Sequence, residues 1–87
     1  MINDRPGSPR PTVRVLELDG TVNLYDSASQ QAAVLNGPAS DIWRLLDGAR
    51  TVEEIVGELA AAYQVEPDEI RPQVVQAVAD LAGFLTP

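Results

Sequence analysis

The chain has 87 residues, enough for one domain with a modest hydrophobic core. It contains no Cys, His or Lys, which excludes disulfides, thiolate and imidazole metal ligands and Schiff-base catalysis, so we expect no enzyme, no metal and no cofactor. The formal net charge of −7, with the Arg residues scattered, disfavours nucleic-acid binding, which depends on Lys and Arg side chains that neutralise phosphates.

Residues 1–11 predict a disordered tail, because they are rich in Pro and offer little apolar side chain to bury. A single folded domain is expected over residues 12–87. No basic segment followed by an apolar run opens the chain, and no stretch reaches the ~20 apolar residues of a membrane-spanning helix. We therefore expect a cytoplasmic protein that makes no contact with a membrane.

Residues 12–35 predict an antiparallel meander of three strands. The segments 12–18 and 21–25 are rich in residues that favour strands and flank Asp19-Gly20, a strong signal for a two-residue hairpin turn. That turn sets a register in which Leu18 faces Thr21. The register also places four apolar side chains on one face, which we expect to be the core face: Val13, Val15, Val22 and Leu24.

The third strand is predicted over residues 31–35, although Ala and Gln favour helices, because the segment is short and a helix start follows it. In a simple meander this strand lies at the edge of the sheet. An edge strand exposes amides and carbonyls with which another chain can pair.

Two helices are predicted next. Asn36 is the expected N-cap of the first helix. Its apolar face is expected to carry the residues spaced at i, i+3, i+4 and i+7, which are Ala39, Ile42, Trp43 and Leu46. Thr51-Val52-Glu53-Glu54 is a capping box, which predicts a second helix from Thr51 with an amphipathic pattern to Tyr63.

The third helix is predicted from Pro67 or Asp68 to about Leu85, with an irregular start caused by Pro72. Its main apolar stripe is expected to face the core and consists of Ile70, Val74, Val78, Leu81 and Leu85. A second stripe beside it has two interpretations, an extension of the buried face or the wall of a groove, and consists of Val75, Ala79 and Ala82.

Several short motifs in this order carry a family resemblance: Leu35-Asn36, Ile42-Trp43, Leu46-Asp47-Gly48 and Thr51-Val52-Glu53-Glu54-Ile55. With three strands before three helices, they resemble the PqqD-like family, the RiPP recognition elements, over residues 13–85. The resemblance implies a winged-helix-like α+β fold, a three-stranded antiparallel meander followed by three helices. It also implies that the protein binds the leader segment of a ribosomally made precursor peptide and presents it to a leader peptidase or another maturation enzyme.

In such domains the leader adds as a strand to the edge of the third strand, and its apolar side chains enter a groove beside the third helix. By that resemblance, the peptide-binding residues are Gln31, Ala32, Ala33, Val34 and Leu35 on the strand and Val75, Ala79 and Ala82 on the helix. The small side chains of the strand leave room for larger ones from the peptide. The protein is expected to be a monomer when free.

The chain looks most like the free-standing elements of lasso-peptide biosynthesis, because of the "LNGPASDIW" segment over residues 35–43. It is also similar to the peptide chaperone of pyrroloquinoline quinone synthesis, which serves a radical enzyme. The competing class is a winged-helix module that binds nucleic acid, since its elements overlap with these. A purely structural or antitoxin-like partner protein is a third class.

Overall fold

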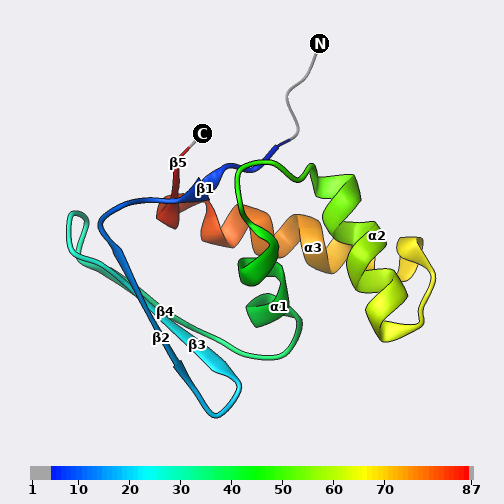
Figure 1. Cartoon of the computed structure of the whole chain (residues 1–87), viewed down its shortest axis with the longest axis horizontal. Helices are drawn as coiled ribbons and strands as arrows, with labels where there is room; N and C mark the ends of the chain where they lie inside the picture. The colour runs from blue at the N-terminus through cyan, green and yellow to red at the C-terminus, as the bar shows by residue number, and fades with distance from the viewer. Residues whose placement is uncertain (1–4, 87) are drawn as a thin grey trace.

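Three long strands form an antiparallel sheet, and three helices pack beside it (Figure 1). The computed structural model describes residues 5–86 and confirms the predicted α+β fold. In chain order the elements are β1 (Ser8–Pro9), β2 (Val13–Leu18), β3 (Thr21–Asp26), β4 (Gln31–Leu35), α1 (Pro38–Leu45), α2 (Val52–Tyr63), α3 (Pro67–Leu81), the 3-10 helix η1 (Ala82–Phe84) and β5 (Leu85–Thr86).

The β2–β3 hairpin follows the predicted register. Asp19 and Gly20 both have positive φ, 50° and 81°, as a type I′ turn requires. Val15 is paired with Leu24, and Leu24 is 2% exposed. Val15 itself is 47% exposed, so the predicted core face is buried on β3 but largely open on β2. The reason is that β2 is an outer strand, of which Val13 alone packs against the core.

Helix α1 begins one residue later than a cap at Asn36 would require. Its N-cap is Gly37, with φ 55° and no capping hydrogen bond from a side chain, so the prediction of Asn36 as the cap is wrong. Pro38 occupies the first helical position, where its fixed φ suits a helix and its missing amide is not needed. The hydroxyl of Ser40 instead ties the helix to the sheet by donating to the Leu35 carbonyl at 2.8 Å.

Helix α2 has the predicted capping box. The Glu54 amide donates to Thr51 Oγ1 at 3.1 Å, and the Thr51 amide donates to Glu54 Oε1 at 2.9 Å. Helix α3 begins at Pro67 with Glu66 as its N-cap and continues through Pro72 as a regular helix. Because η1 and β5 follow, Leu85 belongs to a strand and not to the predicted third helix.

The N-terminal segment is paired with the other end of the chain. Strand β1 is antiparallel to β5, with Ser8 opposite Thr86, and the Arg10 amide donates to the Phe84 carbonyl at 2.9 Å. The prediction of a disordered tail is therefore wrong for residues 8–10. Composition alone could not reveal this, since the pairing partner lies at the far end of the sequence. Residues 1–4 of the predicted tail lie outside the described residues.

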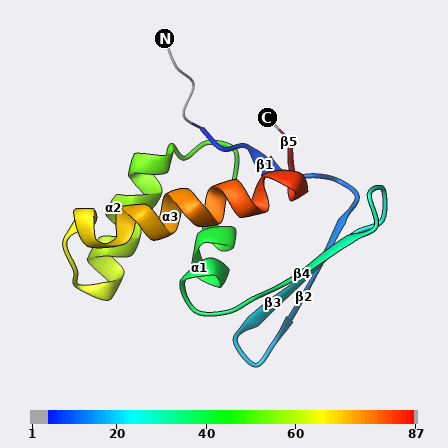
Figure 2. The same ribbon diagram turned by 180° about the vertical axis from the view of Figure 1, so that it is seen from behind.

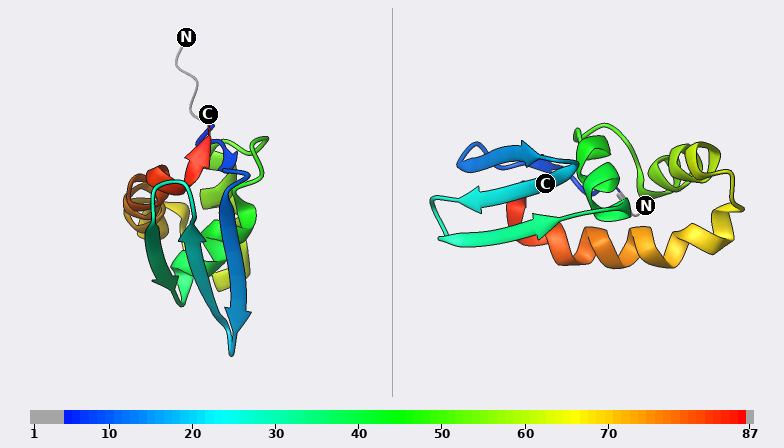
Figure 3. Two further views of the ribbon diagram at one scale, coloured as in Figure 1. Left: turned by 90° about the vertical axis from the view of Figure 1, so that its left-hand side faces the viewer. Right: turned by 90° about the horizontal axis from the view of Figure 1, so that it is seen from below.

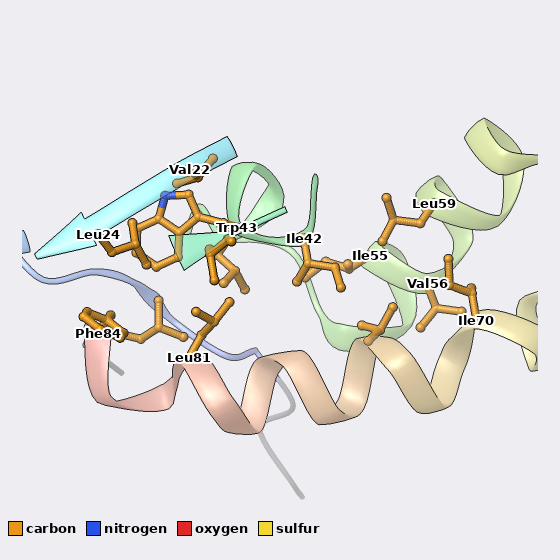
Figure 4. Packing of buried hydrophobic residues seen from close by; sticks show 14 of the residues in the cluster. Val22, Leu24, Ile42, Trp43, Ile55, Val56, Leu59, Ile70, Leu81 and Phe84 are labelled. Carbon is orange, nitrogen blue, oxygen red and sulfur yellow. The ribbon is translucent and has the colours of Figure 1, made fainter. Parts of the chain in front are cut away.

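Buried apolar side chains from the sheet, the three helices and η1 form one core, and Trp43 lies in it beside Val22 and Leu24 (Figure 4). The exposed fraction of these side chains is at most 8%. The cluster consists of Val22, Leu24, Leu35, Ile42, Trp43, Leu46, Ile55, Val56, Leu59, Ala60, Ile70, Val74, Leu81, Phe84 and Leu85. Across residues 5–86, the helices all fall short of the length and apolar character that crossing a membrane would require.

Asp26 is a buried carboxylate at the end of β3. It accepts hydrogen bonds from the Thr12 hydroxyl at 2.5 Å, the Ser29 hydroxyl at 2.8 Å and the Ala28 amide at 3.1 Å. The hydrogen bond from Thr12, followed by that from Ser29, lowers the pKa of Asp26 below its ordinary value of 3.8. The carboxylate therefore joins the segment before β2 to the β3–β4 turn.

Replacing Asp26 with Asn is expected to lower the unfolding temperature at neutral pH and to remove part of its acid dependence. A carboxyl whose pKa is lower in the folded state stabilises the fold above its unfolded pKa of about 3.8, and this stabilisation is lost as the pH falls through the folded pKa. Thermal unfolding of both proteins between about pH 2 and pH 7 should show that the difference in their unfolding temperatures shrinks below about pH 4. A difference in unfolding temperature between wild type and Asp26→Asn that stays constant with pH would contradict this account.

Candidate peptide-binding site

Strand β4 has one side without a partner. The order of the sheet is β2-β3-β4, and within residues 5–86 β4 pairs with β3 and with no other strand. Its position at the edge was predicted from the meander. Successive residues of an edge strand alternate between the two faces of the sheet, while their free amides and carbonyls point along the sheet plane to where another strand can add.

An open cavity of about 480 Å³ lies between helix α3 and the segment that follows β4. Its apolar part includes Ala39 and Ile42 of α1 and Ala77 of α3, and Ile42 is 1% exposed. The whole lining consists of Asn36, Pro38, Ala39, Ile42, Pro72, Gln73, Gln76, Ala77 and Asp80. Since Asn36 directly follows β4, the cavity lies at the Leu35 end of the free edge.

The other end of β4 approaches the end of the third helix. A Cβ built on Gly83 would lie 2.9 Å from Gln31 Oε1, so η1 passes close to the first residue of β4. Contacts at both ends therefore place β4 alongside the C-terminal half of α3, as Figure 3 shows in its right-hand view. We call this region, bounded by residues 31–36 and by the facing side of residues 73–83, the β4–α3 groove.

The predicted strand residues lie at this groove. Ala33 packs against the core, and Leu35 is 8% exposed, so both point inward. Ala32 and Val34 are on the outer face, where Val34 is 67% exposed. Gln31 is exposed at the end beside Gly83.

The predicted helix residues Val75, Ala79 and Ala82 are exposed, and they are absent from the lining of the cavity. At about 100° per residue, Val75 lies about 130° around the helix axis from the mean direction of the lining residues on α3. The structure thus does not bring this stripe together with the strand residues at the cavity. Their contact with a peptide stays a prediction from the sequence alone, and the lining of the cavity favours contact at Ala77 instead.

None of the lining residues of α3 was among the predicted peptide contacts; they are Pro72, Gln73, Gln76, Ala77 and Asp80. They flank the core stripe on its other side. Polar side chains there look like an ordinary solvent-facing surface, and an apolar pattern favours the Val75 side instead. Ala77 could have been found from the sequence, because it is a small apolar residue three positions after the core residue Val74 and so lies next to it on the helix surface.

A second cavity, of about 360 Å³, lies between α1 and α2, and its charged side chains already have partners: Arg44 pairs with Asp41, and Glu58 pairs with Arg50, which lies outside the lining. Arg44 donates to Asp41 at 3.0 Å, and Tyr63 donates a hydrogen bond to the same carboxylate, which raises the pKa of Tyr63 to about 12. Arg44 also pairs with Glu17 of the other edge strand, β2, at 2.6 Å, so this cavity lies near an edge whose neighbouring charges are engaged, and strand addition favours the β4–α3 groove. Within residues 5–86, no three acidic side chains are grouped so that they could hold a metal ion.

Known proteins share these elements. The family model of coenzyme PQQ synthesis protein D (PqqD) matches residues 21–83. A PqqA binding protein of Rhodopseudomonas palustris (strain BisB5) is 46% identical over 50 residues, which are 55% of this chain and 49% of that protein. The chain therefore spans about half the length of this curated relative.

Two solved structures have the same fold. TbiB1 in complex with the TbiA(beta) leader peptide superposes with a TM-score of 0.78 at 25% identity, over 90% of this chain and 93% of that one. Lasso peptide synthetase B1 complexed with the leader peptide gives a TM-score of 0.74 at 23% identity, over 91% and 95%. The family match spans most of the sequence, from the start of β3 into η1, and so includes every element that forms the groove. The chain belongs to the PqqD family, as its sequence motifs had indicated.

Proposed function

We propose that this protein is a RiPP recognition element, which binds the leader segment of a ribosomally made precursor peptide as an added strand on β4. The observation that carries the proposal is the free edge of β4 beside an open groove, in a member of the PqqD family. Backbone hydrogen bonds to β4 would supply affinity that does not depend on sequence. The groove would supply specificity.

The side chains of an added strand alternate between two surroundings. One set would enter the groove, where Ala39, Ile42 and Ala77 offer an apolar surface. The other set would continue the outer face of the sheet beside Val34. The small side chains at Ala32 and Ala33 leave space for larger ones from the leader. We therefore assign peptide contacts to Gln31, Ala32, Ala33, Val34 and Leu35 and to the groove side of α3.

Two kinds of precursor are candidates. TbiB1 and a lasso peptide synthetase B1 share this fold and are both seen with a leader peptide bound, which favours a lasso-peptide precursor. The PqqA binding protein, 46% identical over 50 residues, favours a PqqA-like peptide, for which this protein would be the chaperone that serves a radical enzyme. The fold match that supports the lasso-type interpretation covers 90% of the chain, whereas the sequence match to the PqqA binding protein covers 55% of it.

A binding role without catalysis fits the amino-acid composition. The sequence contains none of the His, Cys and Lys side chains on which most protein nucleophiles and general bases depend. The protein would present its precursor to a separate leader peptidase or another maturation enzyme. We place it in the cytoplasm, because a ribosomally made precursor is modified where it is synthesised, and expect it to be a monomer when free.

Calorimetry with a candidate precursor peptide, sought among short open reading frames near this gene, tests the proposal. The isolated leader segment is expected to bind about as tightly as the full precursor, and the core segment without the leader is expected not to bind. Tight binding of the core segment alone would contradict the leader-binding role. The precursor should keep its mass when it is incubated with the purified protein.

The alternative of nucleic-acid binding rests on the overlap of fold elements with winged-helix modules. A net charge of −7 and ion pairs that engage Arg44, Arg50 and Arg71 oppose it. The protein is expected to pass through a heparin column at low salt without retention. Retention that salt reverses would favour the nucleic-acid alternative.

A further inference from the structure

We infer that Asp80 selects leader peptides that carry a Lys or Arg side chain at one fixed position of the added strand. The inference rests on the proposed function and names the chemistry of the bound segment. Asp80 lines the cavity of the β4–α3 groove, on the α3 wall, and Asn36 and Pro38, which follow β4, line the same cavity. A side chain from an added strand that enters the groove there meets the Asp80 carboxylate.

Asp80 is held in place without being neutralised. Gln76 Nε2 donates to Asp80 Oδ1 at 2.9 Å, one turn earlier on the same helix. No ion pair among residues 5–86 includes Asp80. Both arginines of helices α1 and α3 pair with other carboxylates, Arg44 with Glu17 at 2.6 Å and Arg71 with Glu53 at 2.7 Å. The groove therefore presents an oriented negative charge with no cation of its own.

The surface beside Asp80 suits a long side chain with a charged end. Ala77 and Ala39, which are both partly exposed, line the same cavity and offer apolar contact to the methylene stem of a Lys or Arg, whose charged head would reach the carboxylate. Because the Gln76 amide nitrogen donates to Asp80, the Gln76 carbonyl oxygen can accept a further hydrogen bond. A guanidinium can donate to both acceptors at once, so Arg should be favoured over Lys.

The net charge of −7 attracts basic peptides from a distance but cannot define a position along the strand. The two effects are separable with a matched pair of variants, Asp80→Asn and Glu66→Gln. Each removes one negative charge from α3. Glu66 is the N-cap, makes no capping hydrogen bond with its side chain, and lies about 21 Å along the helix from Asp80, beyond the reach of its field at physiological salt.

A displayed library of random 15-residue peptides, selected in parallel on wild type, Asp80→Asn and Glu66→Gln, tests the inference. Wild type and Glu66→Gln are expected to enrich Arg or Lys at one fixed position relative to the apolar residues of the selected peptides. Asp80→Asn should lose that enrichment. In a selected peptide, replacing the basic residue with Gln should weaken binding to wild type about fivefold and leave binding to Asp80→Asn unchanged. Asp80→Lys should prefer a Glu at that position.

The outcomes separate this inference from the proposed function. Peptides that shift the β4 amides in NMR spectra but carry no fixed basic position would overturn the role of Asp80 and leave strand addition standing. A basic preference that persists in Asp80→Asn would do the same. Failure to select any peptide that perturbs β4 would contradict the proposed function, and with it the inference.

Discussion

Leucine in place of Ala77 is expected to weaken leader binding about thirtyfold, whereas leucine in place of Ala79 should have little effect. Ala77 lines the β4–α3 groove, so a larger side chain there occupies space that an apolar leader residue needs. Losing one buried anchor of a bound peptide typically costs about 2 kcal/mol of binding free energy, which is about thirtyfold in affinity. Calorimetric titration of both variants with the leader measures the difference.

The two alanines make a matched pair. They lie on the same helix and gain the same side chain, but Ala79 is exposed and lies outside the lining of the cavity. Thermal unfolding of both variants checks that the fold is retained, since overpacking at a core position would cost roughly 1–3 kcal/mol of stability. A loss of binding in Ala79→Leu but not in Ala77→Leu would show that the leader lies along the stripe of Val75, Ala79 and Ala82.

Alanine in place of Trp43 is expected to be the most damaging single change to the fold. The indole is 5% exposed and lies against β3 on one side and the end of the third helix on the other (Figure 4). Removing a buried Trp costs about 3–5 kcal/mol, a large part of the roughly 5–15 kcal/mol that holds a small domain folded. The unfolding temperature should fall by at least about 12 °C.

Leu18→Ala is the control for Trp43→Ala, because Leu18 is a large apolar side chain that is 53% exposed on β2. It should change the unfolding temperature by a few degrees at most. Circular dichroism melts of the two variants provide the comparison. Equal losses in the two variants would show that Trp43 is not at the centre of the core.

Features set by residues close together in the sequence were predictable. The positive φ angles of Asp19 and Gly20 follow from the turn type, and that turn fixes the register of β2 and β3. The capping box from Thr51 to Glu54 is likewise a local arrangement of two hydrogen bonds. The edge position of β4 follows from the order of a meander, in which the third strand has one neighbour.

Features that depend on distant parts of the chain were not predictable. The pairing of Ser8 with Thr86 joins the two ends of the sequence, and no local pattern announces it. The side of α3 that faces β4 depends on how the helix turns as it packs against α1, and this decides between Ala77 and Ala79 as groove residues. Hydrophobicity favoured the Ala79 side, because the groove side carries Gln73, Gln76 and Asp80.

The relative position of sheet and helices explains why one edge is suited to a peptide. Seen from behind, α3 runs from α2 toward the end of the sheet where β1 and β5 lie (Figure 2). Strand β4 is the edge that approaches this helix, at Gln31 beside Gly83 and at Asn36 beside the cavity. The opposite edge, β2, has largely exposed side chains, and its Glu17 is paired with Arg44 of α1 at 2.6 Å.

Backbone NOEs between the bound leader and isotope-labelled protein test strand addition most directly. An added strand lies about 4.8 Å from its neighbour, which brings backbone protons of the two chains within NOE range at alternate residues. We expect these NOEs along residues 31–35, with side-chain NOEs from the leader to Ala77 and Ile42. Backbone NOEs along β2 instead, or contacts confined to the cavity between α1 and α2, would contradict the proposed binding mode.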